Sequence, residues 1–193
     1  MPEWQASNYS EAIPEVQKPF SIICVKGTDI FDKPPSTHRF DAPMIYTTTT
    51  VGSFKSATIT IDADWKQRYD QGGLCLMVPI DGSQKWIKAG IEFLDGQPWI
   101  SVVTKDRWAD WSLRPVPDMG TTSATIHIET HDDGSLWVYA REENGKRLPV
   151  REVTWWGELT PETRIDIGPA AAKPSIEGEE LVVYFSGFEL NLS

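Results

Sequence analysis

Apolar and polar residues alternate along most of this chain, and turn residues separate the alternating runs. In residues 55–62, Ala57, Ile59 and Ile61 fall on one side of an extended chain, and the polar residues between them fall on the other. Residues 73–80 are apolar throughout, which predicts a central strand buried on both faces. Helical periodicity is almost absent, so the pattern predicts an all-β protein.

The same pattern continues toward the C-terminus. Strands are expected over residues 55–62, 73–80, 85–94, 98–104, 122–130, 136–141, 147–156, 163–167 and 181–190. Turn signals lie between several of them, at residues 81–83, 95–96, 132–135 and 144–145. Short turns join antiparallel strands, so the prediction is a two-sheet antiparallel β-sandwich.

The length of 193 residues allows a core large enough to fold without disulfides. We therefore expect a single domain over residues 1–193. Its first part, about residues 1–50, is irregular and rich in Pro, Thr and Ser, and we expect it to wrap a sheet edge as one or two strands. Cys24 and Cys75 lie in apolar runs and are expected to be reduced and buried.

Charge and targeting signals limit the classes of partner. The formal net charge is −10 and no cluster of Lys or Arg stands out, which argues against nucleic acid and anionic membrane as partners. The N-terminus has no secretory pattern, and no apolar run approaches the ~18 residues of a membrane span. The expected location is the cytoplasm.

Strand parity indicates which side chains leave the core. In residues 85–94, Ile87, Ala89, Ile91 and Phe93 are expected to face inward. The side chains expected to face outward on this run are Trp86, Lys88 and Glu92. On the two later runs the outward side chains are His127, Glu129, Trp137, Tyr139 and Arg141.

Large aromatic side chains on an outward face must be covered or must bind something. We predict a groove on a concave face that binds a polar ligand such as a sugar. Its stacking walls would be Trp86, Trp137 and Tyr139. Its hydrogen-bonding groups would be Lys88, Glu92, His127, Glu129 and Arg141, with Gln71, Asp110 and Trp111 nearby. Two alternatives stay open: residues 106–120 or the N-terminal segment cover this face, or the charges pair across strands.

Catalytic and metal sites have weaker support. Glu92 and Glu129, with His127, are candidates for an acid/base pair because glycosidases use two carboxyl groups ~5–9 Å apart. Cross-strand Glu–Lys and Glu–Arg pairing explains both residues more simply. His127, Glu129 and His131 can share a strand face, but a three-ligand metal site is not evident. No metal and no cofactor are predicted.

Several short motifs, taken in order, resemble one family. They are residues 8–14 (Asn-Tyr-Ser-Glu-Ala-Ile-Pro), 71–76 (Gln-Gly-Gly-Leu-Cys-Leu), 85–93 (Lys-Trp-Ile-Lys-Ala-Gly-Ile-Glu-Phe), 101–104 (Ser-Val-Val-Thr) and 110–112 (Asp-Trp-Ser). This order is similar to that of the regulation-of-enolase family, a domain of unknown function with a concanavalin A-like fold. The resemblance covers nearly the whole chain. It implies a jelly-roll sandwich in the cytoplasm, linked to control of a glycolytic enzyme, and it supplies no catalytic residues.

Together these observations predict a cytosolic, non-catalytic binding or regulatory module. Its partner would be a metabolic enzyme, or a carbohydrate or other small polar ligand bound on the concave face. The alternative is an enzyme that acts on a carbohydrate or small metabolite in the same groove, with Glu92 and Glu129 as acid and base. A deep pocket with a desolvated glutamate would favour the enzyme. A third possibility is self-association through exposed tryptophans among the nine in the chain.

Overall fold

The computed structural model describes residues 3–80, 83–116 and 120–193. Its elements are β1 (Trp4–Ser7), β2 (Phe20–Cys24), β3 (Ile30–Lys33), β4 (Thr37–Phe40), β5 (Met44–Thr50), β6 (Phe54–Ala63), β7 (Gln71–Ile80), β8 (Ser83–Leu94), β9 (Gln97–Lys105), β10 (Ala109–Pro115), β11 (Ala124–Thr130), β12 (Leu136–Arg141), β13 (Arg147–Val153), the 3-10 helix η1 (Thr154–Glu158), β14 (Arg164–Ala172) and β15 (Leu181–Leu192). Within these ranges, no helix has the length and apolar character needed to cross a membrane.

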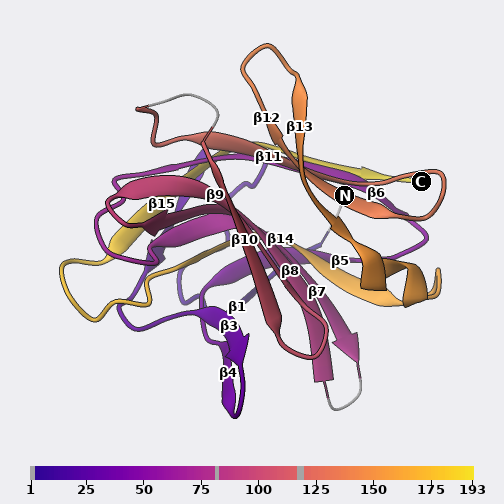
Figure 1. Cartoon of the computed structure of the whole chain (residues 1–193), viewed down its shortest axis with the longest axis horizontal. Coiled ribbons are helices and arrows are strands. Elements are labelled where there is room, and N and C mark those ends of the chain that lie inside the picture. Colours follow the sequence, from indigo (N-terminus) through magenta and orange to yellow (C-terminus); the bar gives the residue numbers. More distant parts are fainter. Residues whose placement is uncertain (1–2, 81–82, 117–119) are drawn as a thin grey trace.

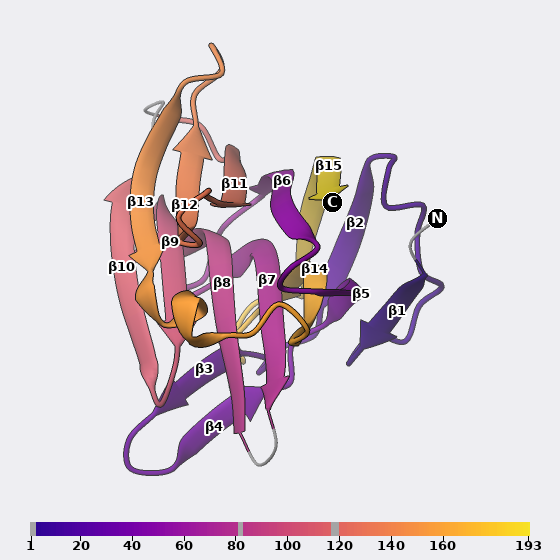
Figure 2. The ribbon, with the colours of Figure 1, turned by 90° about the vertical axis from the view of Figure 1, so that its right-hand side faces the viewer.

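Two antiparallel sheets form the two layers of the molecule (Figures 1 and 2). The seven-stranded sheet has the order β1-β5-β14-β7-β8-β9-β10, and the six-stranded sheet has the order β13-β12-β11-β6-β15-β2. The predicted all-β, two-sheet antiparallel sandwich is confirmed. Strand β13 is an edge strand, as Pro149 indicated, because proline cannot donate a hydrogen bond to a further strand.

The main core lies between the two sheets and contains the inward set that parity predicted. Ile87 and Ala89 from β8, Ile126 and Ile128 from β11, and Val138 from β12 are all fully buried in it. Burial of one valine or isoleucine side chain stabilises the fold by roughly 1.5–3 kcal/mol. Period-two alternation therefore identified the core correctly on three separate strands.

Strand β7 is central in the seven-stranded sheet, as its apolar run predicted. Its glycines face those of β8: Gly73 pairs with Gly90, and a Cβ atom added to Gly90 would lie 1.9 Å from the carbonyl oxygen of Gly72. Only glycine permits this close approach of the two strands. Cys24 and Cys75 are free and buried, and desolvation raises the pKa of both thiols to about 12.

The first fifty residues are more structured than their composition suggested. β1 and β2 lie at the edges of the two sheets, but β3 and β4 form a separate hairpin that crosses the outer face of the seven-stranded sheet (Figure 2). This hairpin covers a second apolar cluster, which includes Ile30, Cys75, Trp86 and Val103. Trp86 is fully buried there, so the N-terminal segment covers the outward tryptophan, one of the two alternatives left open above.

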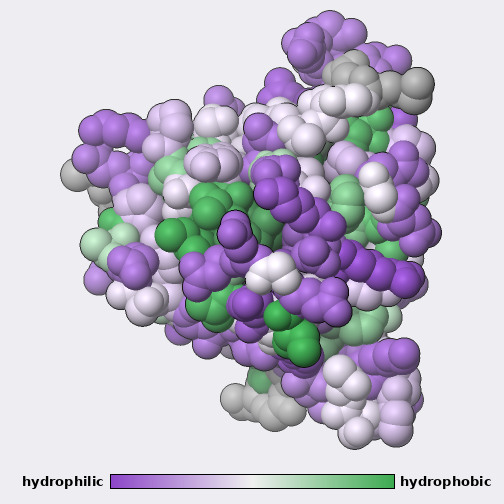
Figure 3. Space-filling view, turned by 90° about the vertical axis from the view of Figure 1, so that its left-hand side faces the viewer, coloured by the Kyte–Doolittle hydropathy of each residue, from purple (hydrophilic) through white to green (hydrophobic). Residues whose placement is uncertain are grey.

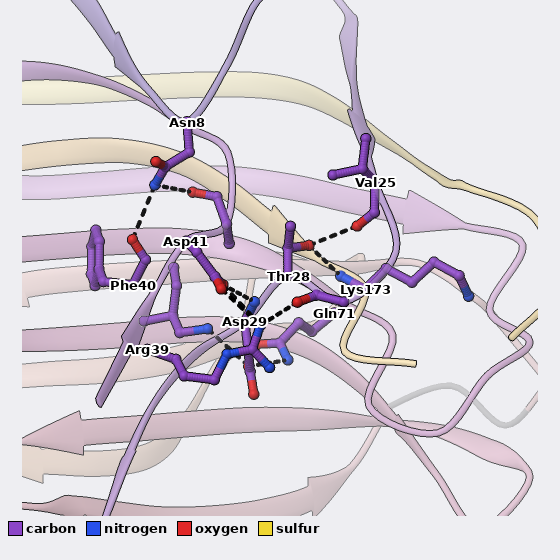
Figure 4. Close-up of polar contacts among 12 residues, drawn as sticks. Asn8, Val25, Thr28, Asp29, Arg39, Phe40, Asp41, Gln71 and Lys173 are labelled. Atoms are coloured by element: carbon purple, nitrogen blue, oxygen red, sulfur yellow. Dashed lines mark hydrogen bonds and ion pairs between the residues drawn. The ribbon is translucent and has the colours of Figure 1, made fainter. Parts of the chain in front are cut away.

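Polar contacts hold the hairpin on the sheet. Asp32 of β3 forms an ion pair with Lys105 of β9 at 2.7 Å, and both side chains are buried. His38 contacts the same carboxylate at 2.9 Å and stacks on Trp108. Figure 4 shows the base of the hairpin, where the Asn8 side-chain amide donates hydrogen bonds to the carbonyl oxygens of Phe40 and Ala42.

The strands near residues 109–115 and 147–156 differ from the predicted ones. Residues 109–115 were not predicted as a strand, yet they form β10 at the edge of the seven-stranded sheet. The strand predicted over 147–156 ends at Val153 and continues as η1, which buries Trp155 and Trp156. Residues 81 and 82 of one predicted turn lie outside the described residues.

Candidate ligand-binding cavity

The residues predicted to form one groove lie on two opposite faces of the sandwich. One set is on the outer face of the seven-stranded sheet: Gln71, Trp86, Lys88, Glu92 and Trp111. The other set is on β11 and β12 of the six-stranded sheet: His127, Glu129, Trp137, Tyr139 and Arg141. The prediction of a shared groove is therefore wrong. Parity shows that a side chain points away from the core, but it does not show from which sheet it points.

The same separation removes the predicted acid/base pair. Glu92 is on β8 and Glu129 is on β11, and these strands belong to different sheets whose inner faces pack together. Their outward carboxyl groups therefore lie on opposite sides of the core. Glu92 and Glu129 cannot act on one substrate.

A cavity of about 470 Å³ lies between the β3–β4 hairpin segment and the outer face of the seven-stranded sheet. We call it the hairpin cavity. Its lining residues are Asp29, Phe31, Lys33, Tyr69, Gln71, Lys88, Glu92, Val103 and Trp111. Three aromatic rings and several charged or amide groups thus surround one space.

Glu92 lies on the sheet side of the hairpin cavity and is only 6% exposed. Its Oε2 atom accepts a hydrogen bond of 2.8 Å from the Ser101 hydroxyl, which accepts one of 2.9 Å from the indole N–H of Trp111. Burial raises the pKa of the Glu92 carboxyl, although the charge of Lys88 and the Ser101 hydrogen bond act in the opposite direction. The charge of Asp29 adds to the increase.

Lys88 and Gln71 connect the hairpin segment to the sheet. The Lys88 ammonium donates hydrogen bonds to the carbonyl oxygen of Ile30, at 3.1 Å, and to Oε1 of Gln71. The Gln71 amide nitrogen donates to Oδ1 of Asp29 at 3.3 Å (Figure 4). Lys88 and Glu92 are four residues apart on β8, so they share a face with only Gly90 between them. The backbone at Gly90 is therefore bare, and it borders a small pocket that also contains Lys88 and Glu92.

Tyr69 forms part of the wall and has an unusual backbone. Its φ angle is +72°, a left-handed conformation that costs a non-glycine residue of order 1–3 kcal/mol. Its ring meets Trp111 edge-on at 6.1 Å. The next residue, Asp70, is buried and accepts hydrogen bonds from the backbone N–H groups of Lys66 and Gln67. These contacts hold the turn that brings Tyr69 to the cavity.

Asp110 does not belong to the hairpin cavity. Its carboxylate pairs with Arg151 of β13, and this contact joins edge strands of the two sheets. The Trp111 indole N–H donates to Ser101 and not to the Asp110 carboxylate.

The outer face of the six-stranded sheet is organised around Glu129. Its carboxylate contacts Nε2 of His127 at 3.0 Å, Nε2 of His131 at 3.1 Å, and Arg147. Tyr139 adds a hydrogen bond to His131 at 3.0 Å. Burial would raise the pKa of Glu129, but these hydrogen bonds and the positive charge of Arg147 outweigh it and lower that pKa.

The aromatic rings on this face stack on one another. Trp137, Tyr139 and His131 have ring centroids 6.1–6.2 Å apart. The Trp137 indole N–H donates to the Ser135 hydroxyl at 3.2 Å. Arg141 pairs in register with Thr125 and Arg147. Cross-strand pairing thus accounts for most of this face. Within the described ranges no group of three His, Cys, Asp or Glu side chains has a metal-binding arrangement.

Five lining residues of the hairpin cavity were not predicted as site residues: Asp29, Phe31, Lys33, Tyr69 and Val103. The first three belong to a segment whose strands are four residues long, too short to show a clear alternation. Tyr69 precedes the two glycines Gly72 and Gly73, and its left-handed backbone leaves no sequence signal. The nearest sequence signal is the pair Gly72-Gly73, because adjacent glycines permit a close approach between strands.

The fold and the hairpin cavity define a jelly-roll sandwich with a ligand-sized cavity on one outer face. The chain belongs to the family described as Protein of unknown function (DUF1349), whose model matches residues 7–192. An uncharacterized protein, AN7484, from Emericella nidulans is 41% identical and covers 100% of this chain and 98% of its own length. The Saccharomyces cerevisiae protein named Regulation of enolase protein 1 is 39% identical over 47% of this chain and 48% of its own length.

A solved structure agrees with the fold over nearly its whole length. A functionally unknown protein from Saccharomyces cerevisiae aligns with a TM-score of 0.80 at 21% identity and covers 98% of this chain and 96% of the other. The resemblance to the regulation-of-enolase family, drawn above from short motifs, is confirmed.

Proposed function

We propose that the protein is a binding module that holds a small, neutral, sugar-like ligand in the hairpin cavity. The observation that carries this proposal is the presence of three aromatic rings and a buried carboxyl group around one space of about 470 Å³. Small-molecule sites typically occupy 300–1,000 Å³ and combine apolar walls with a few placed polar groups.

The chemistry of the lining favours a ring with hydroxyl groups. Phe31, Tyr69 and Trp111 offer apolar ring surface, against which the C–H groups of a sugar ring can pack. Glu92 and Asp29 offer hydrogen-bonding carboxyl groups. Lys33 and Lys88 lie around the same space as these acids, so the lining carries groups of both signs, which favours a neutral ligand over an ion.

Calorimetric titration with three neutral probes tests the proposal: the methyl β-pyranosides of glucose, galactose and xylose. At least one probe is expected to bind, and Trp111→Ala is expected to weaken that binding by about tenfold or more, since buried aromatic contacts often supply 1–2 kcal/mol. Trp137→Ala is the matched control because it removes the same side chain from the opposite face. Equal binding by wild type and Trp111→Ala, with loss in Trp137→Ala, would place the ligand on the other sheet.

A second candidate function is supported by the desolvation of Glu92. A carboxyl group with a raised pKa in a cavity can act as a general acid, and Asp29 is the other carboxylate that lines the same space. An enzyme of this kind would cleave nitrophenyl glycosides, and Glu92→Gln would reduce the rate at least about a hundredfold. Absence of turnover across a panel of such glycosides leaves binding as the function.

The proposed setting is the cytosol, with a metabolic enzyme as protein partner. The support is the name of the yeast relative, Regulation of enolase protein 1. Mixing the purified chain with yeast enolase should produce a complex in size-exclusion chromatography or a change in enolase rate. No complex and no change at micromolar concentrations would remove enolase as a direct partner.

A further inference from the structure

We propose that Glu92 binds the ligand as a neutral carboxylic acid, donating a hydrogen bond to an uncharged oxygen acceptor, so that binding takes up a proton. This inference rests on the proposed function, because it concerns a ligand in the hairpin cavity. It restricts the possible ligands to molecules that present an ether, carbonyl or hydroxyl oxygen toward β8.

The direction of the hydrogen bonds near Glu92 carries the argument. An indole N–H can only donate, so the bond from Trp111 uses an acceptor site of the Ser101 hydroxyl. The Ser101 hydrogen then points to Oε2 of Glu92, which must accept it. When the carboxyl group is protonated, its hydrogen therefore sits on Oε1.

Oε1 is the atom left for the ligand. No hydrogen bond joins Oε1 to any of the described residues, whereas Oε2 is held by Ser101. Glu92 lines both the hairpin cavity and the smaller pocket below it, where Gly90 leaves the backbone bare. The acid hydrogen on Oε1 is thus available to donate to a ligand oxygen beside the bare backbone at Gly90.

The charged groups around Glu92 do not fix it as an anion. Lys88 on the same strand favours the ionised form, but its ammonium already donates to Ile30 and Gln71. Asp29, which precedes β3, opposes ionisation of Glu92. The other titratable groups that line the cavity are Lys33 and Tyr69. A neutral ligand that fills the cavity removes water from Glu92 and so disfavours its anion further.

The first test measures binding of the three methyl pyranosides between pH 5 and 8. Above the pKa of Glu92 in the free protein, the affinity is expected to fall roughly tenfold per pH unit, because only the protonated form binds. Titrations in two buffers with different ionisation enthalpies should show uptake of about one proton at the upper end of this range.

A substitution makes the test sharper. Glu92→Gln keeps the shape of the side chain and is neutral at every pH: its amide oxygen accepts from Ser101, and its NH₂ group replaces the acid O–H. This variant is expected to bind with the same affinity at pH 5 and pH 8, and to bind more tightly than wild type at pH 8. Glu129→Gln is the matched control and should follow the wild-type pH dependence.

The outcomes separate the two proposals. If no methyl pyranoside binds wild type at any pH, the proposed function fails and this inference fails with it. If a methyl pyranoside binds without proton uptake and with constant affinity, only the inference is overturned. The same follows if Glu92→Gln abolishes binding at every pH while its melting temperature is at least that of wild type, because the ligand then requires the anion.

Discussion

The two outer faces of this sandwich each carry one glutamate among aromatic side chains, yet the pKa values of the two carboxyl groups are shifted in opposite directions. Glu129 is surrounded by donors, namely His127, His131 and Arg147, and its pKa is lowered. Glu92 has one donor, Ser101, and its burial under the hairpin raises its pKa. A satisfied carboxylate stabilises a surface, whereas a carboxyl group with a free oxygen in a cavity is available to a ligand.

The difference arises from the N-terminal hairpin. On the seven-stranded sheet, β3 and β4 cover the outward residues, exclude water from Trp86 and Glu92, and enclose the hairpin cavity.

Figure 3 views the molecule from the side opposite to that of Figure 2, and hydrophobic side chains form patches among hydrophilic ones there. The exposed large hydrophobic residues include Ile23, Val25, Ile176 and Tyr184; none of the nine tryptophans is among them. Four tryptophans are buried and five are partly exposed, so self-association through tryptophan, the third possibility, stays a prediction.

The largest expected effect comes from breaking the buried ion pair of the covered face. Asp32→Ala leaves the Lys105 ammonium without its 2.7 Å partner in a buried position, which should cost about 3–5 kcal/mol of unfolding free energy. Arg147→Ala, on the other face, removes a half-exposed partner of Glu129 and should cost only about 0–1 kcal/mol. Urea denaturation of both variants measures the difference, and equal losses would contradict the assigned role of the hairpin.

A smaller effect is expected at Gly90, which lines the smaller pocket next to Lys88 and Glu92. Gly90→Ala would place a Cβ atom 1.9 Å from the Gly72 carbonyl oxygen and must push β7 and β8 apart, at a cost of at least about 1–3 kcal/mol. Gly157→Ala is the control, because an added Cβ meets no atom within 4 Å there. Thermal melts should separate the two variants. A neutral Gly90→Ala would show that the strands can separate freely.

The smallest effects are opposite changes of stability with pH. The pKa of Glu92 is raised in the folded state, so its contribution is retained at low pH and lost as the pH rises through the folded-state pKa. The pKa of Glu129 is lowered, so its contribution is present above the unfolded-state pKa and is lost as the pH falls through the folded-state pKa.

Two glutamine variants measure these signs. At pH 8 Glu92→Gln should be more stable than wild type, because it removes a buried charge, and Glu129→Gln should be less stable, because it removes an ion-pair partner. Denaturation curves at pH 4.5 and pH 8 would give the comparison. Destabilisation by Glu92→Gln at pH 8 would mean that its carboxylate is paired in the folded protein.

The sequence predicted the core well because alternation is a local property. Ile87, Ile126 and Val138 each lie in a run long enough to show which side of the strand is apolar, and all three are buried as expected. The same reasoning correctly turned Trp86 and Trp137 away from the core. It could not place them on the same or on different sheets, since that depends on pairings between strands far apart in the chain.

The cavity could be predicted only in part for a related reason. Gln71, Lys88, Glu92 and Trp111 were predicted as site residues and do line it, although only Lys88 and Glu92 came from strand parity. Residues 29–33 cover the cavity on the side away from the sheet, and β3 within them is only four residues long, too short for an alternating pattern to predict it. Their position depends on the tertiary pair between Asp32 and Lys105, which no local pattern indicates.

The site assignment is tested most directly by finding which tryptophan N–H signal shifts when the ligand binds. In a spectrum that resolves the indole N–H signals, titration with the methyl β-pyranosides should shift the signal of Trp111, whose N–H begins the hydrogen-bond chain to Glu92. The signal of Trp137, which donates to Ser135 on the opposite face, should stay in place. A shift of the Trp137 signal with no change at Trp111 would contradict the assignment of the ligand site to the hairpin cavity.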